Sequence, residues 1–455
     1  MVFSSITFLF YFLPFVLLAT YTLPWRNAVL LVSGLLFYAW GDARDLPVLL
    51  GCIAINYAAG LFVTRAGRVG RLALAAGVGG DLALLFAFKY SGFVGQQIGV
   101  ALPHPALPLG ISFFTFQGIS YLVDIRRGIV PPQRSLLTFA TFKAMFPPLI
   151  AGPIVRYAEI AGQLEQRHVL PEQLRAGVEA FCIGLAQKVL LANTLAGPVD
   201  TIFAADPARL SALAAWVGAV GYALQIYFDF CGYSNMAIGL GRMLGFELPQ
   251  NFNLPYASRS LTEFWRRWHM TLSRWFRDYL YIPLGGSRVS APRVYANLFT
   301  VFLLCGLWHG ASWNFAVWGL YHGTFLAAEH AARRSQFVSL LRQVPSVLRH
   351  AYLLVVVVIG WTFFRIDTFG GAWSYLHAML GASRHPVMLA GDFVTGSMLA
   401  ALAIGCVLSV WDRWPAVVPY AIRPAAAQVG CITLLLLSAC SLAAGTYNPF
   451  IYFRF

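Results

Sequence analysis

The chain has 455 residues, of which 59% are hydrophobic and only 11% are charged, and its formal net charge at pH 7 is +14. Soluble domains carry roughly 25% charged residues, and disordered chains are rich in charge and poor in apolar residues, so both classes are excluded. We therefore expect an all-α integral membrane protein. We attribute its excess of Lys and Arg mainly to cytoplasmic loops, where positive residues set the orientation of the spans, and not to a surface that binds nucleic acid.

Apolar segments follow one another along the whole chain. They lie near residues 6–23, 27–40, 46–63, 71–89, 107–125, 176–196, 210–231, 294–308, 312–330, 348–365, 394–411 and 427–445. The first has no basic flank and no small-residue cleavage site, so we expect a retained span and not a signal peptide. Several are shorter than the ~20 residues of a perpendicular span. We expect about 11–12 transmembrane helices, with re-entrant and interfacial helices, in one domain over residues 1–455.

Arginine placement predicts the orientation of these spans. Three arginines follow the third segment, at 65–71, and three follow the fifth, at 126–134. Because cytoplasmic loops collect Lys and Arg, this pattern places the N-terminus outside the cytoplasm. The basic loop at 333–349 has the same parity.

One apolar stretch, at 145–153, carries three prolines and a glycine. A continuous helix would lose backbone hydrogen bonds there. Irregular backbone at membrane depth is tolerated only when it is packed in protein or lines a cavity. Two interpretations stay open: a kinked loop, or the re-entrant wall of a cavity.

The only long polar stretch is the interfacial segment 247–293, where seven arginines face three acidic residues. Ser260 and Glu263 have the spacing of a capping box, which predicts a helix that begins there and ends near Pro283. Its expected apolar face consists of Trp265, Trp268, His269, Leu272, Phe276 and Tyr279. A helix with an aromatic face and an arginine face is typical of a membrane interface, so a plain anchor is one interpretation. The inward position of His269 argues for a functional role.

Two further histidines follow. His309 lies where one apolar segment ends, and helix ends favour polar residues, so a structural role is the simpler reading. His322 lies about 15 Å along the next segment at 1.5 Å per residue, near mid-membrane. An ionisable residue at that depth indicates a functional site, with a buried structural histidine as the alternative. Gly319 and Gly323 flank it and would allow a backbone or a ligand to approach closely.

These residue types suit acyl transfer. A neutral imidazole can take the proton of a hydroxyl that attacks a thioester, and a second polar group can orient the donor or stabilise the oxyanion. Arginines suit the phosphates of coenzyme A or of a carrier protein's prosthetic arm. There is no G-x-S-x-G, H-E-x-x-H or P-loop motif and no C-x-x-C pair among the seven cysteines, so we expect no serine elbow and no metal site.

Several motifs together resemble the membrane-bound O-acyltransferase family, in particular its bacterial alginate O-acetyltransferase branch. The family motifs stand at residues 263–273, 275–286, 307–310 and 319–323, and the branch motifs at 2–5, 146–153, 229–234 and 449–453. The resemblance spans essentially the whole chain. It implies that His322 is the catalytic histidine and His269 the second active-site histidine. We assign donor binding to the residues around them: Arg266, Arg267, Arg274, Arg277, Trp268, Trp308 and His309.

The resemblance also implies a setting for the chemistry. Helices would surround a central funnel or tunnel in the bacterial inner membrane. An acyl thioester such as acetyl-CoA would arrive from the cytoplasm, and periplasmic acetyl-transfer proteins would complete transfer to an exopolysaccharide. Alginate is the polysaccharide that the resemblance favours most. Peptidoglycan or cellulose O-acetylation and D-alanyl transfer to a cell-envelope polymer remain alternatives. A transporter or flippase is the non-enzyme alternative, against which stands the lack of an internal repeat.

Overall fold

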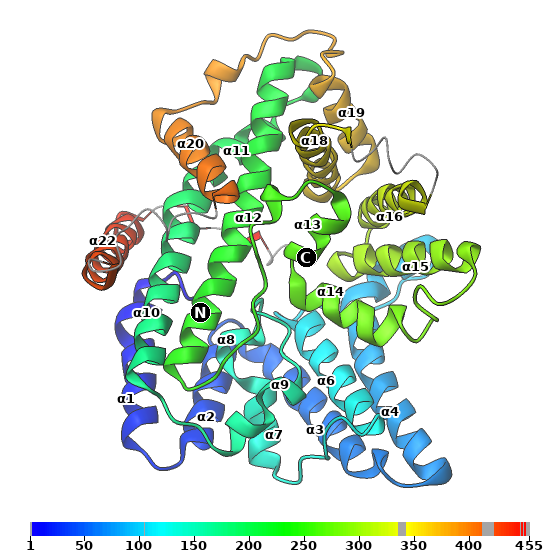
Figure 1. Cartoon of the computed structure of the whole chain (residues 1–455), viewed down its shortest axis with the longest axis vertical. Coiled ribbons are helices and arrows are strands. Elements are labelled where there is room, and N and C mark those ends of the chain that lie inside the picture. Colours follow the sequence, from blue (N-terminus) through cyan, green and yellow to red (C-terminus); the bar gives the residue numbers. More distant parts are fainter. Residues whose placement is uncertain are drawn as a thin grey trace. The chain divides into compact units, whose positions relative to one another are not determined.

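The computed structural model describes residues 2–103, 105–334, 343–411, 423–445, 447–448 and 450–451. Over these ranges the regular structure is helical (Figure 1). The one pairing of extended backbone in the described residues is an isolated bridge between Leu210 and Met388. The all-α prediction is confirmed. Residues 335–342 of the basic loop, and Pro449 and residues 452–453 of the last motif, lie outside the described residues.

The chain forms two compact units, each assembled from several stretches of sequence. Unit 1 contains Met1–Leu185, Gly232–Gln250 and Gln428–Ala443. Its elements are η1 (Phe8–Phe12), α1 (Leu13–Thr22), α2 (Arg26–Ala39), η2 (Ala43–Asp45), α3 (Leu46–Val63), α4 (Gly67–Leu85), η3 (Phe86–Tyr90), α5 (Ser91–Ile98), α6 (Ile111–Arg126), α7 (Leu136–Ala144), α8 (Phe146–Leu149), α9 (Tyr157–Glu165), most of α10 (Pro171–Ala186), the end of α12 (Ala212–Met243) and most of α22 (Arg423–Ala443). Helices α3, α4 and α6 pack against one another, and α2 packs on α7 and α8.

The proline-rich stretch at 145–153 is irregular, as expected. Only its residues 146–149 form a short helix, α8, and every residue of the stretch is buried inside unit 1. The broken backbone is therefore packed in protein, the setting in which such backbone is tolerated at membrane depth.

Unit 2 contains Ala186–Cys231, Asn251–Ala427 and Ala444–Phe455. Its elements are η4 (Gln187–Ala192), α11 (Asn193–Ala204), η5 (Pro207–Arg209), the first part of α12, η6 (Pro255–Ala257), α13 (Leu261–Arg267), α14 (Met270–Phe276), η7 (Arg277–Tyr281), α15 (Ala291–His309), α16 (Trp313–Arg334), α18 (Ser346–Arg365), α19 (Phe369–Met379), η8 (Ala390–Asp392) and α20 (Gly396–Val410). Helices α15 and α16 form a close antiparallel pair. Helix α16 also packs on α13 and α18. The predicted site residues lie on α13, α14, η7, α15 and α16 and in the turn between α13 and α14.

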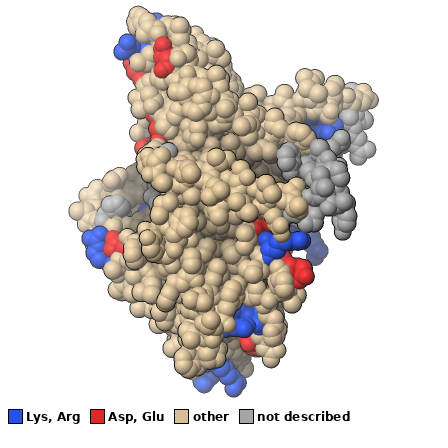
Figure 2. Space-filling model, turned by 90° about the vertical axis from the view of Figure 1, so that its left-hand side faces the viewer, with Lys and Arg blue, Asp and Glu red and all other residues tan. Residues whose placement is uncertain are grey.

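Seven helices in the described residues are long and apolar enough to cross a membrane. They lie at 43–63, 67–98, 171–204, 212–243, 291–309, 346–365 and 425–443, and shorter apolar helices lie at 8–22, 26–39 and 396–410. The larger number expected from the sequence also counted shorter apolar runs and the 22-residue helix at 313–334, which is not one of these seven. On the face shown in Figure 2, charged side chains lie in a few small groups that are separated by wide uncharged areas. The chain is a multi-pass membrane protein.

A buried ion pair lies inside unit 2. Lys188 Nζ is 2.7 Å from Asp229 Oδ1, and both side chains are almost fully buried. Lys188 also donates to Asn193 Oδ1 at 2.7 Å, while Asp229 Oδ2 accepts from the backbone N–H of Ile451 at 2.8 Å. Both residues lie in apolar segments of the sequence, but nothing in the sequence identified them as partners of each other. The pair and its hydrogen bonds fasten residues near the C-terminus to α12.

Replacing Lys188 by Met should strongly destabilise the protein, because Asp229 would keep a buried charge without its cation. Loss of one partner of a buried pair costs about 3–5 kcal/mol. Thermal unfolding of the detergent-solubilised protein measures the loss. The double variant Lys188→Met/Asp229→Leu should regain most of it, since an apolar replacement of the whole pair is often neutral. Arg175→Met, which breaks the exposed Arg175–Glu179 pair, is the matched control. Equal melting temperatures for the Lys188 and Arg175 variants would contradict the argument.

Candidate active site

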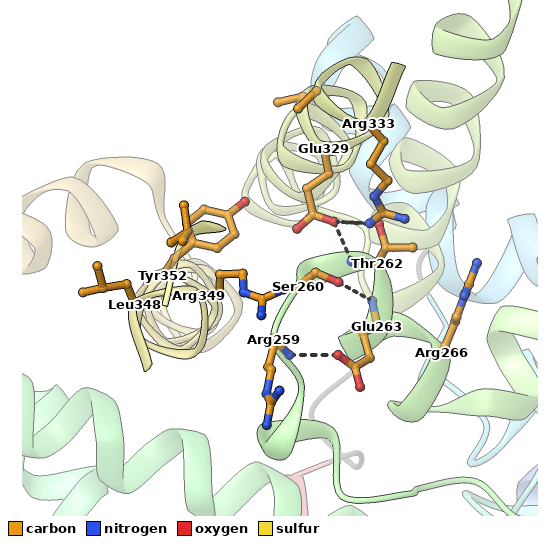
Figure 3. A pocket seen from close by; sticks show the side chains of 13 residues that line it. Arg259, Ser260, Thr262, Glu263, Arg266, Glu329, Arg333, Leu348, Arg349 and Tyr352 are labelled. Carbon is orange, nitrogen blue, oxygen red and sulfur yellow. Dashed lines mark hydrogen bonds and ion pairs between the residues drawn. The ribbon is translucent and has the colours of Figure 1, made fainter. Parts of the chain in front are cut away.

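Helix α13 begins where the capping-box spacing predicted. The Ser260 hydroxyl accepts a hydrogen bond from the backbone N–H of Glu263 at 3.2 Å. A second cap comes from α16, where the Glu329 carboxylate accepts from the N–H groups of Leu261 (2.6 Å) and Thr262 (3.1 Å) and from the Thr262 hydroxyl (2.7 Å) (Figure 3). A carboxylate is favourable at a helix N-terminus because the first N–H groups have no partner inside the helix. Glu329 therefore fixes the start of α13 to α16.

The predicted single helix from Ser260 to Pro283 is wrong, because it breaks at His269. Helix α13 ends at Arg267, Trp268 is extended, and His269 has φ +42° and ψ +54°, in the left-handed region. The segment at 251–253 provides hydrogen-bond partners for backbone groups on either side of the break. The N–H of Met270 donates to the Asn251 carbonyl, and the N–H of Asn253 donates to the Arg267 carbonyl, both at 2.9 Å. The one apolar face expected for the whole segment is thus divided between α13 and α14.

Asn251 also fixes the His269 imidazole. Its Oδ1 lies 3.0 Å from His269 Nδ1 and accepts from the Thr271 N–H at 3.3 Å and the Thr271 hydroxyl at 2.9 Å. Because a backbone N–H can only donate, the shared Asn251 atom is the carbonyl oxygen, and Nδ1 must carry the hydrogen that faces it. The Nε2 atom of this tautomer bears the lone pair. Burial lowers the pKa of His269, which favours the neutral ring.

His322 lies on α16 and is 1% exposed. Its ring meets Trp265, Trp318 and Tyr321 in edge contacts, with centroid distances of 5.0, 5.0 and 5.1 Å. Neither ring nitrogen has a hydrogen-bond partner among the described residues. Buried polar groups are normally paired, so an imidazole left unpaired in an aromatic cage is available to a substrate.

Glycines bring the neighbouring helices close to His322. A Cβ at Gly319 would lie 2.2 Å from the Phe302 carbonyl oxygen of α15, which confirms the expected close approach of another backbone. A Cβ at Gly360 of α18 would lie 2.6 Å from His322 Nε2. Gly360 is thus a determinant of the site that the sequence did not reveal, since nothing local distinguishes it from other glycines in apolar segments.

A cavity of about 280 Å³, which we call the histidine pocket, lies beside His269. Its lining includes His269, His309, Trp265, Trp268, Arg266 and Arg277. Trp308 links two of the histidines, since its ring lies 6.0 Å from that of His269 and 4.9 Å from that of His309. His322 lies behind Trp265, which both lines the pocket and contacts the His322 ring. The three histidines therefore share one aromatic cluster.

The predicted donor-binding arginines do not all meet at this pocket. Arg266 and Arg277 line it, although Arg277 also pairs with Asp278 at 2.6 Å. Arg267 forms an ion pair with Glu263 at 2.8 Å and is not among the lining residues. Arg274 does not line it either. The break at His269 separates side chains that a continuous helix would have presented together.

Asn251 should be needed for the tautomer of His269 and not only for the fold. Asn251→Leu removes the acceptor and should lower kcat/KM by about tenfold or more, as for other partners that orient a functional histidine. Asn251→Asp keeps an acceptor but favours the imidazolium, so the pKa of His269 should rise and the acidic limb of the pH profile should move to higher pH. The profile of kcat/KM against pH measures both effects. Thr271→Val, which leaves the His269 contact in place, should keep the wild-type profile. A wild-type profile in both Asn251 variants would contradict this role.

Comparison with known proteins extends these observations. The model of the membrane-bound O-acyltransferase family matches residues 132–364. This range holds the three buried histidines and all of the lining residues named above. The chain belongs to the membrane-bound O-acyltransferase family. The resemblance inferred from the motifs is confirmed, and the protein is an O-acyltransferase.

Relatives of this acyltransferase cover most of its length. It is 43% identical over 395 residues to the probable alginate O-acetylase AlgI of Azotobacter vinelandii, covering 83% of this chain and 78% of the relative. It is 44% identical over 396 residues to the protein of the same name from Pseudomonas aeruginosa, with 83% and 75% covered. A peptidoglycan O-acetyltransferase of Helicobacter pylori is 36% identical over 428 residues, with 84% and 80% covered.

Proposed function

We propose that this acyltransferase moves acetyl groups from a cytoplasmic thioester, acetyl-CoA, across the bacterial inner membrane for O-acetylation of an extracytoplasmic polysaccharide, alginate. The observation that supports it most directly is the pair of buried imidazoles, His269 and His322, within one aromatic cluster. The relatives named as probable alginate O-acetylases are 43% and 44% identical, against 36% for the peptidoglycan O-acetyltransferase, which favours alginate as the acceptor. Periplasmic acetyl-transfer proteins complete the delivery to the polymer.

In the proposed reaction His322 is the general base. It takes the proton of the acceptor hydroxyl while that oxygen forms a bond to the thioester carbonyl carbon. The tetrahedral intermediate collapses by breaking the C–S bond, and the imidazolium returns its proton to the sulfur that leaves. His269, held by Asn251 in the tautomer with the lone pair on Nε2, orients the groups that react. Exclusion of water by the surrounding indoles strengthens these electrostatic interactions and limits hydrolysis of the thioester.

Purified protein in proteoliposomes tests the proposal. Radiolabelled acetyl-CoA is added outside or inside the vesicles, and labelled D-alanyl carrier protein is the competing donor. Transfer of acetyl to an acceptor hydroxyl on the opposite side, lost in His322→Ala, is the expected result. D-alanyl transfer without acetyl transfer would show that the donor is the D-alanyl carrier protein and not acetyl-CoA. Movement of a sugar lipid with no thioester cleavage would overturn the enzymatic role. Acetyl analysis of alginate and peptidoglycan from cells with and without the gene distinguishes the polymers.

A further inference from the structure

A second cavity of unit 2 lies next to the histidine pocket and has a different chemistry. It has a volume of about 720 Å³, and we call it the arginine pocket. Three helices build it: the start of α13, the end of α16 and the start of α18 (Figure 3). Its charged lining consists of Arg259, Arg266, Arg333 and Arg349 with Glu263 and Glu329. Of these, the earlier donor assignment included only Arg266.

The two glutamates do not neutralise this pocket. Glu329 is occupied by the α13 N-terminus and by Arg333, at 2.9 Å. Glu263 accepts from the Arg259 backbone N–H and pairs with Arg267, which lies outside the lining. In the described part of the chain, the guanidinium groups of Arg259, Arg266 and Arg349 have no carboxylate partner, and Arg349 Nε is buried without a hydrogen bond. Like charges gathered in one cavity repel one another unless an anion joins them.

The position of the arginine pocket suits a ligand that enters from the cytoplasm. It lies where α16 ends and α18 begins, and positive residues collect at the cytoplasmic ends of spans. Thr262 and Arg266 line both this pocket and the histidine pocket, so the two cavities adjoin. Along α16, His322 lies about 16 Å from Arg333 at 1.5 Å per residue. A ligand with phosphate at one end and a reactive group on a long arm matches this separation.

We propose that the arginine pocket binds the phosphate groups of the acyl donor, through Arg259 and Arg349, while the pantetheine arm passes Arg266 into the histidine pocket. This inference rests on the proposed function and changes its donor site. Guanidinium groups bind phosphate oxygens through paired, charge-assisted hydrogen bonds, which fits residues that lack other partners. The phosphate can belong to coenzyme A or to the prosthetic arm of a carrier protein, because both have a phosphate ester on pantetheine.

Equilibrium binding to the full-length protein in phosphate-free detergent tests the inference without relying on transfer. The probes are coenzyme A, 3′,5′-ADP, 4′-phosphopantetheine and pantetheine. Arg259→Gln and Arg349→Gln should each weaken coenzyme A binding about tenfold, as expected for one charge-assisted phosphate contact. The affinity for pantetheine, which has no phosphate, should not change. Arg288→Gln is the control, because Arg288 is exposed and lines neither pocket.

Each outcome decides the assignment. Arginine-dependent binding of 3′,5′-ADP identifies coenzyme A as the source of the phosphate, and arginine-dependent binding of 4′-phosphopantetheine alone identifies a carrier protein. Wild-type affinity for coenzyme A in both variants would overturn the inference, as would stabilisation by phosphatidylglycerol that depends on Arg349 without any coenzyme A binding. If the wild type binds coenzyme A in this way but transfers no acetyl group, the proposed function fails and the phosphate site stands. If transfer occurs with an unchanged KM for acetyl-CoA in both variants, the function stands and the site fails.

Discussion

His322→Ala should reduce acetyl transfer at saturating donor by at least about a hundredfold, the lower end of what a positioned general base contributes. The reason is the environment of the ring, which is buried, caged by Trp265, Trp318 and Tyr321, and unpaired at both nitrogens among the described residues. Because the ring makes no hydrogen bond with the described residues, its removal should cost little stability beyond that of the cavity it leaves. Single-turnover transfer from labelled acetyl-CoA measures the chemical step.

His377→Ala is the matched control for this variant. His377 is exposed on α19, and its ring contacts the Trp373 carbonyl of its own helix. The His377→Ala protein should transfer acetyl at the wild-type rate and accumulate in the membrane to the same yield as the wild type. Full transfer by the His322 variant at equal protein concentration would remove His322 from the reaction.

His269→Asn should lower kcat/KM by at least about a hundredfold while the protein keeps nearly its wild-type melting temperature. Asparagine is chosen because it adopts the left-handed region more readily than other residues, and His269 has φ +42°. The variant thus removes the imidazole and leaves the turn between α13 and α14. His269→Ala should lose activity and also stability, since a left-handed backbone costs of order 1–3 kcal/mol in a residue that does not favour it.

Leu254→Asn is the control that distinguishes an effect of the left-handed backbone from an effect of the lost imidazole. Leu254 is the other non-glycine residue of the described chain with positive φ, at +45°, and it has no titratable group. Asparagine there should leave transfer unchanged. If His269→Asn is as active as this control, His269 contributes only to the turn.

Local signals in the sequence predicted the elements that depend on local chemistry. The segment expected at 312–330 is the helix α16, Trp313–Arg334. The helix start at Ser260 followed from hydrogen bonds between near neighbours. The family followed from motifs that the comparisons bear out.

Features that depend on distant residues were not predictable in this way. The periodicity of apolar residues continues through Trp268 and His269. The helix nevertheless breaks there, where Asn251 bonds the His269 ring and the backbone N–H of Met270. Lys188 and Asp229 lie on different helices, so neither charge identified the other. Arg259 and Arg349, which line one pocket, come from the interfacial segment and from the end of the basic loop, 90 residues apart in the sequence. Spacing along one helix favoured Arg274 instead, which lines neither pocket.

The cap that Glu329 forms on α13 has a consequence for how a ligand reaches His322. Trp265 lies on the capped helix and separates the histidine pocket from His322, which lies on the helix that provides the cap. Sliding α13 along α16 would break three hydrogen bonds at once. Rotating the Trp265 side chain breaks none, because its indole N–H has no partner among the described residues. We therefore expect a ligand to reach His322 by rotation of this one indole on a fixed helical frame, a motion that gives up ring contacts with Phe302, Trp318 and His322 but no side-chain hydrogen bond.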